Sequence, residues 1–258
     1  MTEAIFKDHF SVQSQAYAAA RPTYPDALFD VIAAAAPRPC RVWEPGCGSG
    51  QATRGLSSRF DHVHATDASA AQLAHHWAQD PAIAGNVTLA VEAAESTVLP
   101  DRSVGVVAVA QALHWFVRDA FFAECDRVLE PGGVLATWGY GDFDVPAGME
   151  AAVAGFRADI AAHWPPDRTD VDARYKRFSM PFEPLEVPRL ELRPQVTLVR
   201  FLDYLRSSSA TVRCVRATGV DPVEAHRSAL EAAWGDATTR EIHWPLFGQL
   251  RRKPLETH

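Results

Sequence analysis

The chain has 258 residues, of which 47% are hydrophobic and 22% are charged, and its 25 basic and 32 acidic side chains give a net charge of −7. This composition is ordinary for a globular protein, so it argues against disorder, and the length suits one large domain or one domain with a small cap. The acidic balance argues against a nucleic-acid binder, because such proteins usually carry a surplus of basic residues.

Strands and helices are expected to alternate through the first half of the chain. Residues 1–36 read as short amphipathic helices that are interrupted at Pro22 and Pro25. Beyond them we expect strands at about 41–45, 62–66, 86–91, 104–110 and 134–140, with helices at 51–59, 69–79 and 118–129. The fourth strand is continuously apolar, which is typical of a strand covered on both faces. This alternation implies right-handed crossovers and a doubly wound parallel sheet of the α/β class.

The rhythm of the chain changes after Asp142. Residues 147–163 and 196–234 read mostly as helix, whereas residues 182–193 and 238–250 alternate enough to form two late strands. We therefore expect three parts, which are an N-terminal helical lid at 1–36, a core at 37–141 and 182–258, and a cap insertion at 142–181.

Cysteine spacing and the length of apolar runs bear on compartment and partners. Cys40, Cys47, Cys125 and Cys214 have neither the spacing of metal ligands nor that of a disulfide framework. The first residues include charged side chains and no apolar core of the signal-peptide type. No run approaches the ~18 apolar residues that a membrane span needs. We expect a reduced, soluble, cytoplasmic protein, monomer or homodimer, with no metal and no membrane or nucleic-acid partner.

A glycine-rich turn joins the first predicted strand to its helix. It reads Glu44-Pro45-Gly46-Cys47-Gly48-Ser49-Gly50, and Asp67 follows the second strand about 20 residues later. Glycines at alternate positions remove Cβ atoms, so a ligand can approach the backbone closely. An acid at the end of the second strand can accept hydrogen bonds from ribose hydroxyls, although the same acid could simply cap the next helix. The spacing predicts binding of an adenosine-type cofactor.

Two adenosine cofactors compete for this turn, a nicotinamide dinucleotide and S-adenosylmethionine. A dinucleotide fingerprint needs a third small residue, and that position falls on Gln51. Glu44 would also face a pyrophosphate with like charge. S-adenosylmethionine carries an ammonium and a sulfonium instead, so a carboxylate attracts it, and the helix N-terminus after Gly50 can take its carboxylate group. The turn therefore favours S-adenosylmethionine.

Three segments together resemble a known family. They are the glycine turn, Tyr17-Ala18-Ala19-Ala20-Arg21-Pro22-Thr23-Tyr24-Pro25 ahead of it, and Gln111-Ala112-Leu113-His114-Trp115-Phe116 after it. The sequence is similar to class I S-adenosylmethionine-dependent methyltransferases over residues 6–140. Within them it resembles the "type 11" small-molecule subgroup, which includes trans-aconitate methyltransferase-like enzymes. The resemblance implies a Rossmann-like seven-stranded sheet, its last strand antiparallel, with a helical cap inserted after strand five.

The resemblance also assigns residues to the cofactor. Those expected to contact it are Arg21, Glu44, Gly46, Gly48, Gly50, Asp67, Ala68, Ala93, Ala94 and Gln111. Glu92-Ala93-Ala94-Glu95 stands where methyltransferases hold adenine. The family often has an acid there, and Ala93 replaces it in one register, whereas a shift by one residue would recruit Glu92. Arg21 is expected in a lid, where it meets the donor's carboxylate or the substrate; its plain alternative is a surface ion pair.

The acceptor is expected to lie beside the end of the fourth strand. Tyr17, His114 and Trp115 are the predicted substrate contacts, and His114 is the predicted catalytic residue, although a lone histidine often only packs a loop. The sequence lacks the Asn or Asp, Pro, Pro, aromatic motif of methyltransferases that act on amides or nucleobases. Its absence favours a small-molecule substrate over an exocyclic amine.

We expect methyl transfer from S-adenosylmethionine to a small acceptor through oxygen. A carboxylate acceptor is already ionised at neutral pH and needs no base, whereas a hydroxyl acceptor would use His114 as the base. Two alternatives stay open at this point, an NAD(P)-dependent oxidoreductase and a non-catalytic S-adenosylmethionine-binding protein.

Overall fold

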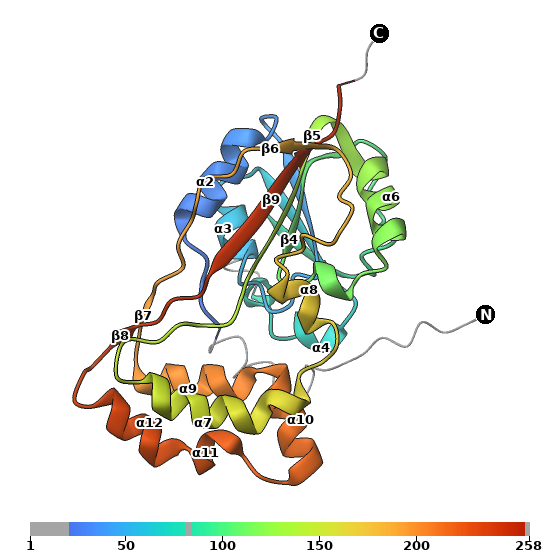
Figure 1. The fold of residues 1–258 in the computed structure, drawn as a ribbon. Helices are drawn as coiled ribbons and strands as arrows, with labels where there is room; N and C mark the ends of the chain where they lie inside the picture. Colours follow the sequence, from blue (N-terminus) through green and yellow to red (C-terminus); the bar gives the residue numbers. More distant parts are fainter. Residues whose placement is uncertain (1–20, 81–83, 256–258) are drawn as a thin grey trace.

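The centre of the molecule is a seven-stranded sheet in the order β3-β2-β1-β4-β5-β9-β6 (Figure 1). The computed structural model describes residues 21–80 and 84–255. The strands are β1 (Arg41–Pro45), β2 (His62–Asp67), β3 (Val87–Val91), β4 (Val104–Ala110), β5 (Leu129–Tyr140), β6 (Glu183–Leu185) and β9 (Leu246–Arg252). β1 to β5 run parallel, and β9 is antiparallel to both β5 and β6. The predicted doubly wound sheet with an antiparallel last strand is confirmed.

Helices cover both faces of this sheet. They are α2 (Asp26–Ala35), α3 (Thr53–Ser57), α4 (Ala70–Leu73) and α6 (Arg118–Val128), with α8 (Arg168–Asp172) and the 3-10 turns η1 (Trp77–Gln79) and η2 (Leu113–Trp115) at the sheet's end. The two faces of β4 explain its continuous apolar run. Val106 and Ala108 pack in the cluster that includes Ile32 of α2, while Val107 and Val109 pack in the cluster of Phe121 from α6. Burial of both faces is what a parallel strand requires.

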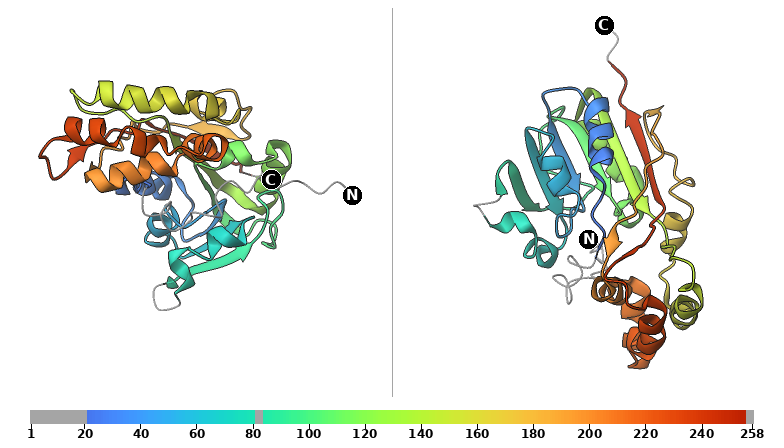
Figure 2. Two further views of the ribbon diagram at one scale, coloured as in Figure 1. Left: turned by 90° about the horizontal axis from the view of Figure 1, so that it is seen from below. Right: turned by 90° about the vertical axis from the view of Figure 1, so that its left-hand side faces the viewer.

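A second layer of helices lies beyond the carboxyl ends of the parallel strands, at the bottom of Figure 1 and of the right-hand view in Figure 2. It contains α7 (Glu150–Ile160), η3 (Ala161–His163), α9 (Leu198–Ser207), α10 (Ser209–Thr218), α11 (Pro222–Ala225) and α12 (Arg227–Trp234). These helices share one hydrophobic cluster, in which Phe156, Leu205 and Trp234 are almost fully buried. A ribbon of β7 (Gln195–Val196) and β8 (Arg240–Glu241) lies where the chain enters and leaves the layer.

The helical layer draws on two parts of the sequence. The predicted cap, residues 142–181, supplies α7 and η3 to this layer and α8 to the end of the sheet, and α9 to α12 come from the segment expected to belong to the core. The predicted boundaries of lid, core and cap stay a prediction. Within the described residues, no helix combines the length and the apolar character that a membrane crossing demands.

Two long predicted helices are divided in the structure. The helix expected at 69–79 stops at Leu73, because His76 adopts an extended backbone and its ring accepts a hydrogen bond from the N–H of Ala78, which starts η1. The helix expected at 196–234 is four helices. Ser208 caps α10 with its hydroxyl, and Gly219 ends it with a φ of 76°. Capping side chains and a left-handed glycine are ordinary causes of such breaks.

Candidate functional site

The turn between β1 and α3 contains three glycines with positive φ, at 69° for Gly46, 57° for Gly48 and 90° for Gly50. Two of them are required by packing. A Cβ on Gly46 would lie 2.8 Å from the Cβ of Ala112, and one on Gly50 would lie 2.5 Å from Nε2 of His76. Gly48 differs, because a Cβ there would meet no atom of the described residues within 4 Å. The backbone of Gly48 therefore faces open space that a ligand can enter.

Asp67 holds this turn in place from the end of β2. Its Oδ2 accepts a hydrogen bond from the N–H of Gly48 at 2.9 Å, and its Oδ1 accepts one from the N–H of Ser69 at 2.8 Å. Ser69 in turn caps α4. Asp67 thus orders the start of the α4 segment and also lies directly beside Gly48, where the ribose prediction requires an acid. Ala68, between Asp67 and Ser69, is exposed.

Glu44 is the most unusual group in this region. It is 1% exposed, and neither carboxylate oxygen has a hydrogen-bond partner among the described residues. Burial raises its pKa to about 8, and the nearby charge of Asp67 adds to the rise. The hydroxyl of Thr53 is close enough to oppose the rise, but its hydrogen bond is made with Nε2 of His76 and not with Glu44. An unpaired buried carboxylate is costly, so it favours a ligand that brings a positive charge and disfavours one that brings a pyrophosphate.

The segment after β3 lies beside Asp67, at the carboxyl ends of the same set of parallel strands. The N–H of Glu92 donates to the carbonyl of Asp67, and the carboxylate of Glu92 lies 3.3 Å from Nε2 of His64. Ala93 is exposed and Ala94 is buried. In the register that uses Glu92, the adenine amine would have to compete with His64 for the carboxylate of Glu92.

Gln111 begins the connection after β4 with a φ of 52°. Its side-chain carbonyl accepts from the N–H of Tyr140 at 2.9 Å, and its side-chain amide donates to the carbonyl of Tyr140 at 3.1 Å. The side chain therefore joins the ends of β4 and β5. A contact between Gln111 and a cofactor would have to use its backbone.

His114 lies on η2 and is held by a residue that the sequence did not reveal. Its Nδ1 is 3.0 Å from the hydroxyl of Tyr175, and its ring stacks at an angle on Trp115, with 4.6 Å between centroids. Tyr175 is 1% exposed and follows α8 with a φ of 56°. Burial, with a smaller contribution from the charge of Arg168, lowers the pKa of His114 to about 3. His114 is therefore neutral at physiological pH.

Arg21 connects the sheet to the helical layer. Its guanidinium donates to the hydroxyl of Tyr140 at 3.4 Å and to the carbonyl of Ser207 at 3.1 Å, and it lies over the ring of Tyr204, 5.3 Å from the centroid. Tyr140 ends β5 and Ser207 ends α9, so Arg21 lies between the two layers. Tyr17, the other predicted lid residue, falls outside the described residues.

Glu44, Gly48 and Asp67 thus lie together at the carboxyl ends of β1 and β2. Gln111 begins the segment that carries η2 at the carboxyl end of β4, which is the other neighbour of β1. The strand order reverses between β1 and β4, and open α/β sheets bind ligands at the carboxyl ends of the strands beside such a switch point. Among the residues that the structure describes, no three metal-ligating side chains come together.

Comparison with known proteins places this arrangement in a family. Residues 43–137 match the family described as a methyltransferase domain. A solved protein from Anaeromyxobacter dehalogenans, named as a type II methyltransferase, is 39% identical, with a TM-score of 0.82 over 92% of this chain and 99% of that one. A protein of Dictyostelium discoideum named as a methyltransferase is 28% identical over 98% of this chain and 97% of its own. The chain belongs to the class I S-adenosylmethionine-dependent methyltransferases.

Proposed function

We propose that the site formed by Glu44, Gly48 and Asp67 binds S-adenosylmethionine, with the donor's ammonium on Glu44 and its ribose hydroxyls on Asp67. The buried, unpaired carboxylate of Glu44 carries this proposal, because an ammonium supplies the positive charge and the hydrogen bonds that its oxygens lack. The open space at Gly48 lets the ligand lie against the backbone. Ala93 and Ala94 are assigned to adenine, and Gly46, Gly50, Ala68 and Gln111 to the surrounding backbone.

The same residues argue against a nicotinamide dinucleotide. Its pyrophosphate would lie on the glycine turn beside the carboxylate of Asp67, and it would bring no positive charge that could ionise the buried carboxyl group of Glu44. Like charges in a buried site repel strongly, since little water screens them. The residues present fit the methyl donor and not the dinucleotide.

When bound, S-adenosylmethionine supplies a methyl group on a positively charged sulfur. The protein contributes alignment and exclusion of water, and well-oriented systems can gain roughly 7–11 kcal/mol from such alignment. The glycine turn and Asp67 fix the donor on the sheet. Arg21 links Tyr140 at the end of β5 to Ser207 of the helical layer.

We assign the acceptor to a small molecule that presents a carboxylate oxygen. With a pKa of about 3, His114 is a weak base at neutral pH, so it is poorly suited to remove a proton from a hydroxyl. A carboxylate is already ionised near neutral pH and needs no base. His114 then acts as a neutral hydrogen-bonding group that orients the acceptor, with Trp115 beside it, and the guanidinium of Arg21 favours an anionic substrate.

The test is a screen of small carboxylic and hydroxy acids with S-adenosylmethionine, in which formation of S-adenosylhomocysteine is measured. Turnover with carboxylates and none with their hydroxyl-only analogues supports the assignment; turnover with hydroxyl-only compounds alone contradicts it. Stabilisation by S-adenosylhomocysteine with no turnover on any acceptor would indicate a non-catalytic binding protein.

Replacing Tyr175 with phenylalanine is expected to lower turnover roughly 5- to 10-fold and leave the affinity for S-adenosylhomocysteine unchanged. The variant keeps the ring packing on Phe178 and Phe247 but removes the hydroxyl that orients His114, and one hydrogen bond contributes about 1 kcal/mol. Turnover and calorimetric affinity are compared with those of His75→Ala, an exposed control. Unchanged turnover in Tyr175→Phe would remove His114 orientation from the mechanism.

A further inference from the structure

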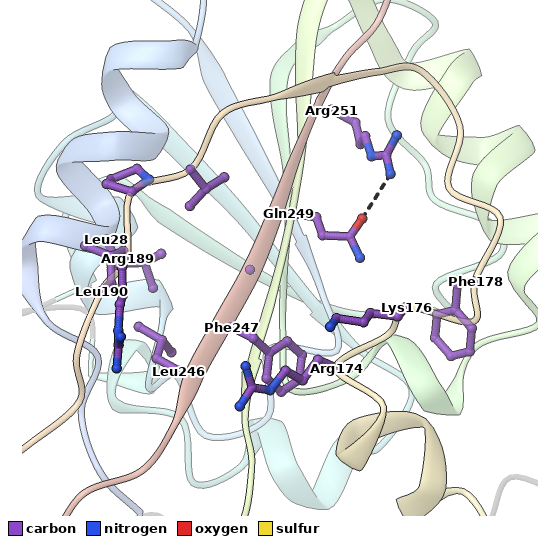
Figure 3. Close-up of a pocket in the computed structure, with 13 residues that line it drawn as sticks. Leu28, Arg174, Lys176, Phe178, Arg189, Leu190, Leu246, Phe247, Gln249 and Arg251 are labelled. Carbon is purple, nitrogen blue, oxygen red and sulfur yellow. Dashed lines mark hydrogen bonds between the residues drawn. The ribbon is translucent and has the colours of Figure 1, made fainter.

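A groove of about 520 Å³ lies along β9, separated from β1 by β4 and β5. In Figure 3, Leu28, Leu190 and Leu246 lie on one side of β9, while Lys176, Phe178, Gln249 and Arg251 lie on the other. The volume falls within the range of about 300–1,000 Å³ that is typical of small-molecule sites. The glycine turn contributes no residue to it.

The charge of this groove is one-sided. Four of its lining residues are basic, Arg174, Lys176, Arg189 and Arg251, and no acidic side chain lines it within the described part of the chain. Arg189 is exposed and pairs with Glu191 at 2.9 Å. The structure gives Arg174 and Lys176 no ion pair with any described residue. A chain with a net charge of −7 thus concentrates unneutralised positive charge at one place.

Arg251 lines the groove and carries one donor without a described partner. One Nη donates to the side-chain carbonyl of Gln249 at 3.1 Å, and Nε is buried without a hydrogen-bond partner among the described residues. A buried unsatisfied donor is unfavourable, and a guanidinium matches the geometry of phosphate and carboxylate oxygens. Figure 3 shows Lys176, Gln249 and Arg251 on the same side of β9, and all three line the groove.

The backbone that presents two of these cations is in an uncommon conformation. Arg174 and Tyr175 are consecutive residues with φ of 54° and 56°, a region that side chains other than glycine rarely adopt. This turn directs Tyr175 inward to His114 and leaves Arg174 and Lys176 lining the groove. Strained backbone of this kind concentrates at functional sites.

Protection of a sheet edge is a simpler explanation for the charges. β6 pairs with β9 only at Leu250–Arg252, so Leu246–Gln249 has no strand on that side, and cations often prevent edge pairing. That role requires exposed charges alone. It does not account for the groove beside these charges or for the aromatic walls that Phe178 and Phe247 provide.

We propose that this groove is a second ligand site, which binds a small organic molecule with two or more anionic phosphate or carboxylate groups. Arg251, Lys176 and Arg174 hold the anionic groups, and Phe178 and Phe247 contact the apolar part. The site is separate from the proposed cofactor site, so the two can be tested independently.

The experiment is calorimetry of the full chain with pyrophosphate and with citrate, two probes that distinguish phosphate from carboxylate recognition. We expect binding of at least one, weakened 10-fold or more by the double variant Lys176→Gln, Arg251→Gln. The matched control is Arg213→Gln, Arg216→Gln, which removes the same charge from exposed positions on α10. Gly48→Ala is expected to keep anion binding, which separates this site from the cofactor site.

Three results would overturn the proposal. They are a dissociation constant weaker than about 1 mM for both probes, equal weakening in the double variant and its control, and loss of anion binding in Gly48→Ala. Circular dichroism of each variant establishes that a loss of binding is not a loss of folding.

Discussion

Replacing Glu44 with glutamine is expected to stabilise the ligand-free protein above pH 8 and to weaken binding of S-adenosylhomocysteine. In the folded state the pKa of Glu44 is raised from 4.5 to about 8, mainly because the carboxyl group is buried. The folded state therefore holds a proton that the unfolded state releases, and stability falls as the pH rises from about 4.5 to 8. A shift of this size corresponds to a few kcal/mol of unfolding free energy, which glutamine would recover.

The measurement is urea unfolding of the two proteins at pH 6 and pH 9. The wild type should lose stability relative to Glu44→Gln between these values, while its affinity for S-adenosylhomocysteine should exceed that of the variant by roughly 10- to 100-fold, as expected for a lost charged hydrogen bond. Glu124→Gln is the control, because Glu124 already pairs with Arg127 at 2.7 Å on α6. A Glu44→Gln variant that binds as tightly as the wild type would remove Glu44 from the site.

Replacing Gly48 with alanine is expected to abolish most cofactor binding at a small cost in stability. A Cβ here meets no atom within 4 Å in the part of the chain that the structure describes, so the expected cost is that of the left-handed backbone, about 1–2 kcal/mol. The same Cβ occupies the space in which the ligand would approach the backbone. We expect the affinity for S-adenosylhomocysteine to fall at least 10-fold, since a displaced ligand loses several contacts.

Gly85 provides a matched control for this change. It has a φ of 56°, nearly that of Gly48, and a Cβ on it also meets none of the described residues within 4 Å. Gly85→Ala should therefore lower the melting temperature about as much as Gly48→Ala does, without any change in affinity. Equal affinities in the two variants would show that the backbone of Gly48 does not face the ligand.

The parts of the fold that the sequence predicted are those whose causes are local. Short apolar runs that alternate with helical segments predicted β1 to β5. The glycine turn and Asp67 could be recognised from their spacing within one strand–helix–strand unit. Gly46 and Gly50 show why these positions must be glycine, because a Cβ on Gly46 would collide with Ala112 and one on Gly50 with His76. Backbone constraints of this kind act at each position separately.

The missing parts depend on contacts between distant segments. Tyr175 contacts His114 although 61 positions separate them in the sequence, and no motif around Tyr175 predicts the contact. The side chain of Gln111 is used by Tyr140 because the ends of β4 and β5 lie together, which periodicity does not describe. The late strands were expected at 182–193 and 238–250, but the first is only β6, and the second is divided into β8 and β9, which ends at Arg252. Alternation alone does not set where pairing begins.

The central claim is that Glu44 is built to receive the cationic end of a methyl donor, and proton-linked calorimetry tests it most directly. Binding of S-adenosylhomocysteine at pH 6.5 is measured in buffers with different ionisation enthalpies. Because a carboxyl group with a pKa of about 8 is protonated at this pH and must ionise against an ammonium, we predict release of close to one proton per ligand, absent in Glu44→Gln. Binding without proton release, or no binding beside tight binding of NAD or NADP, would contradict the account.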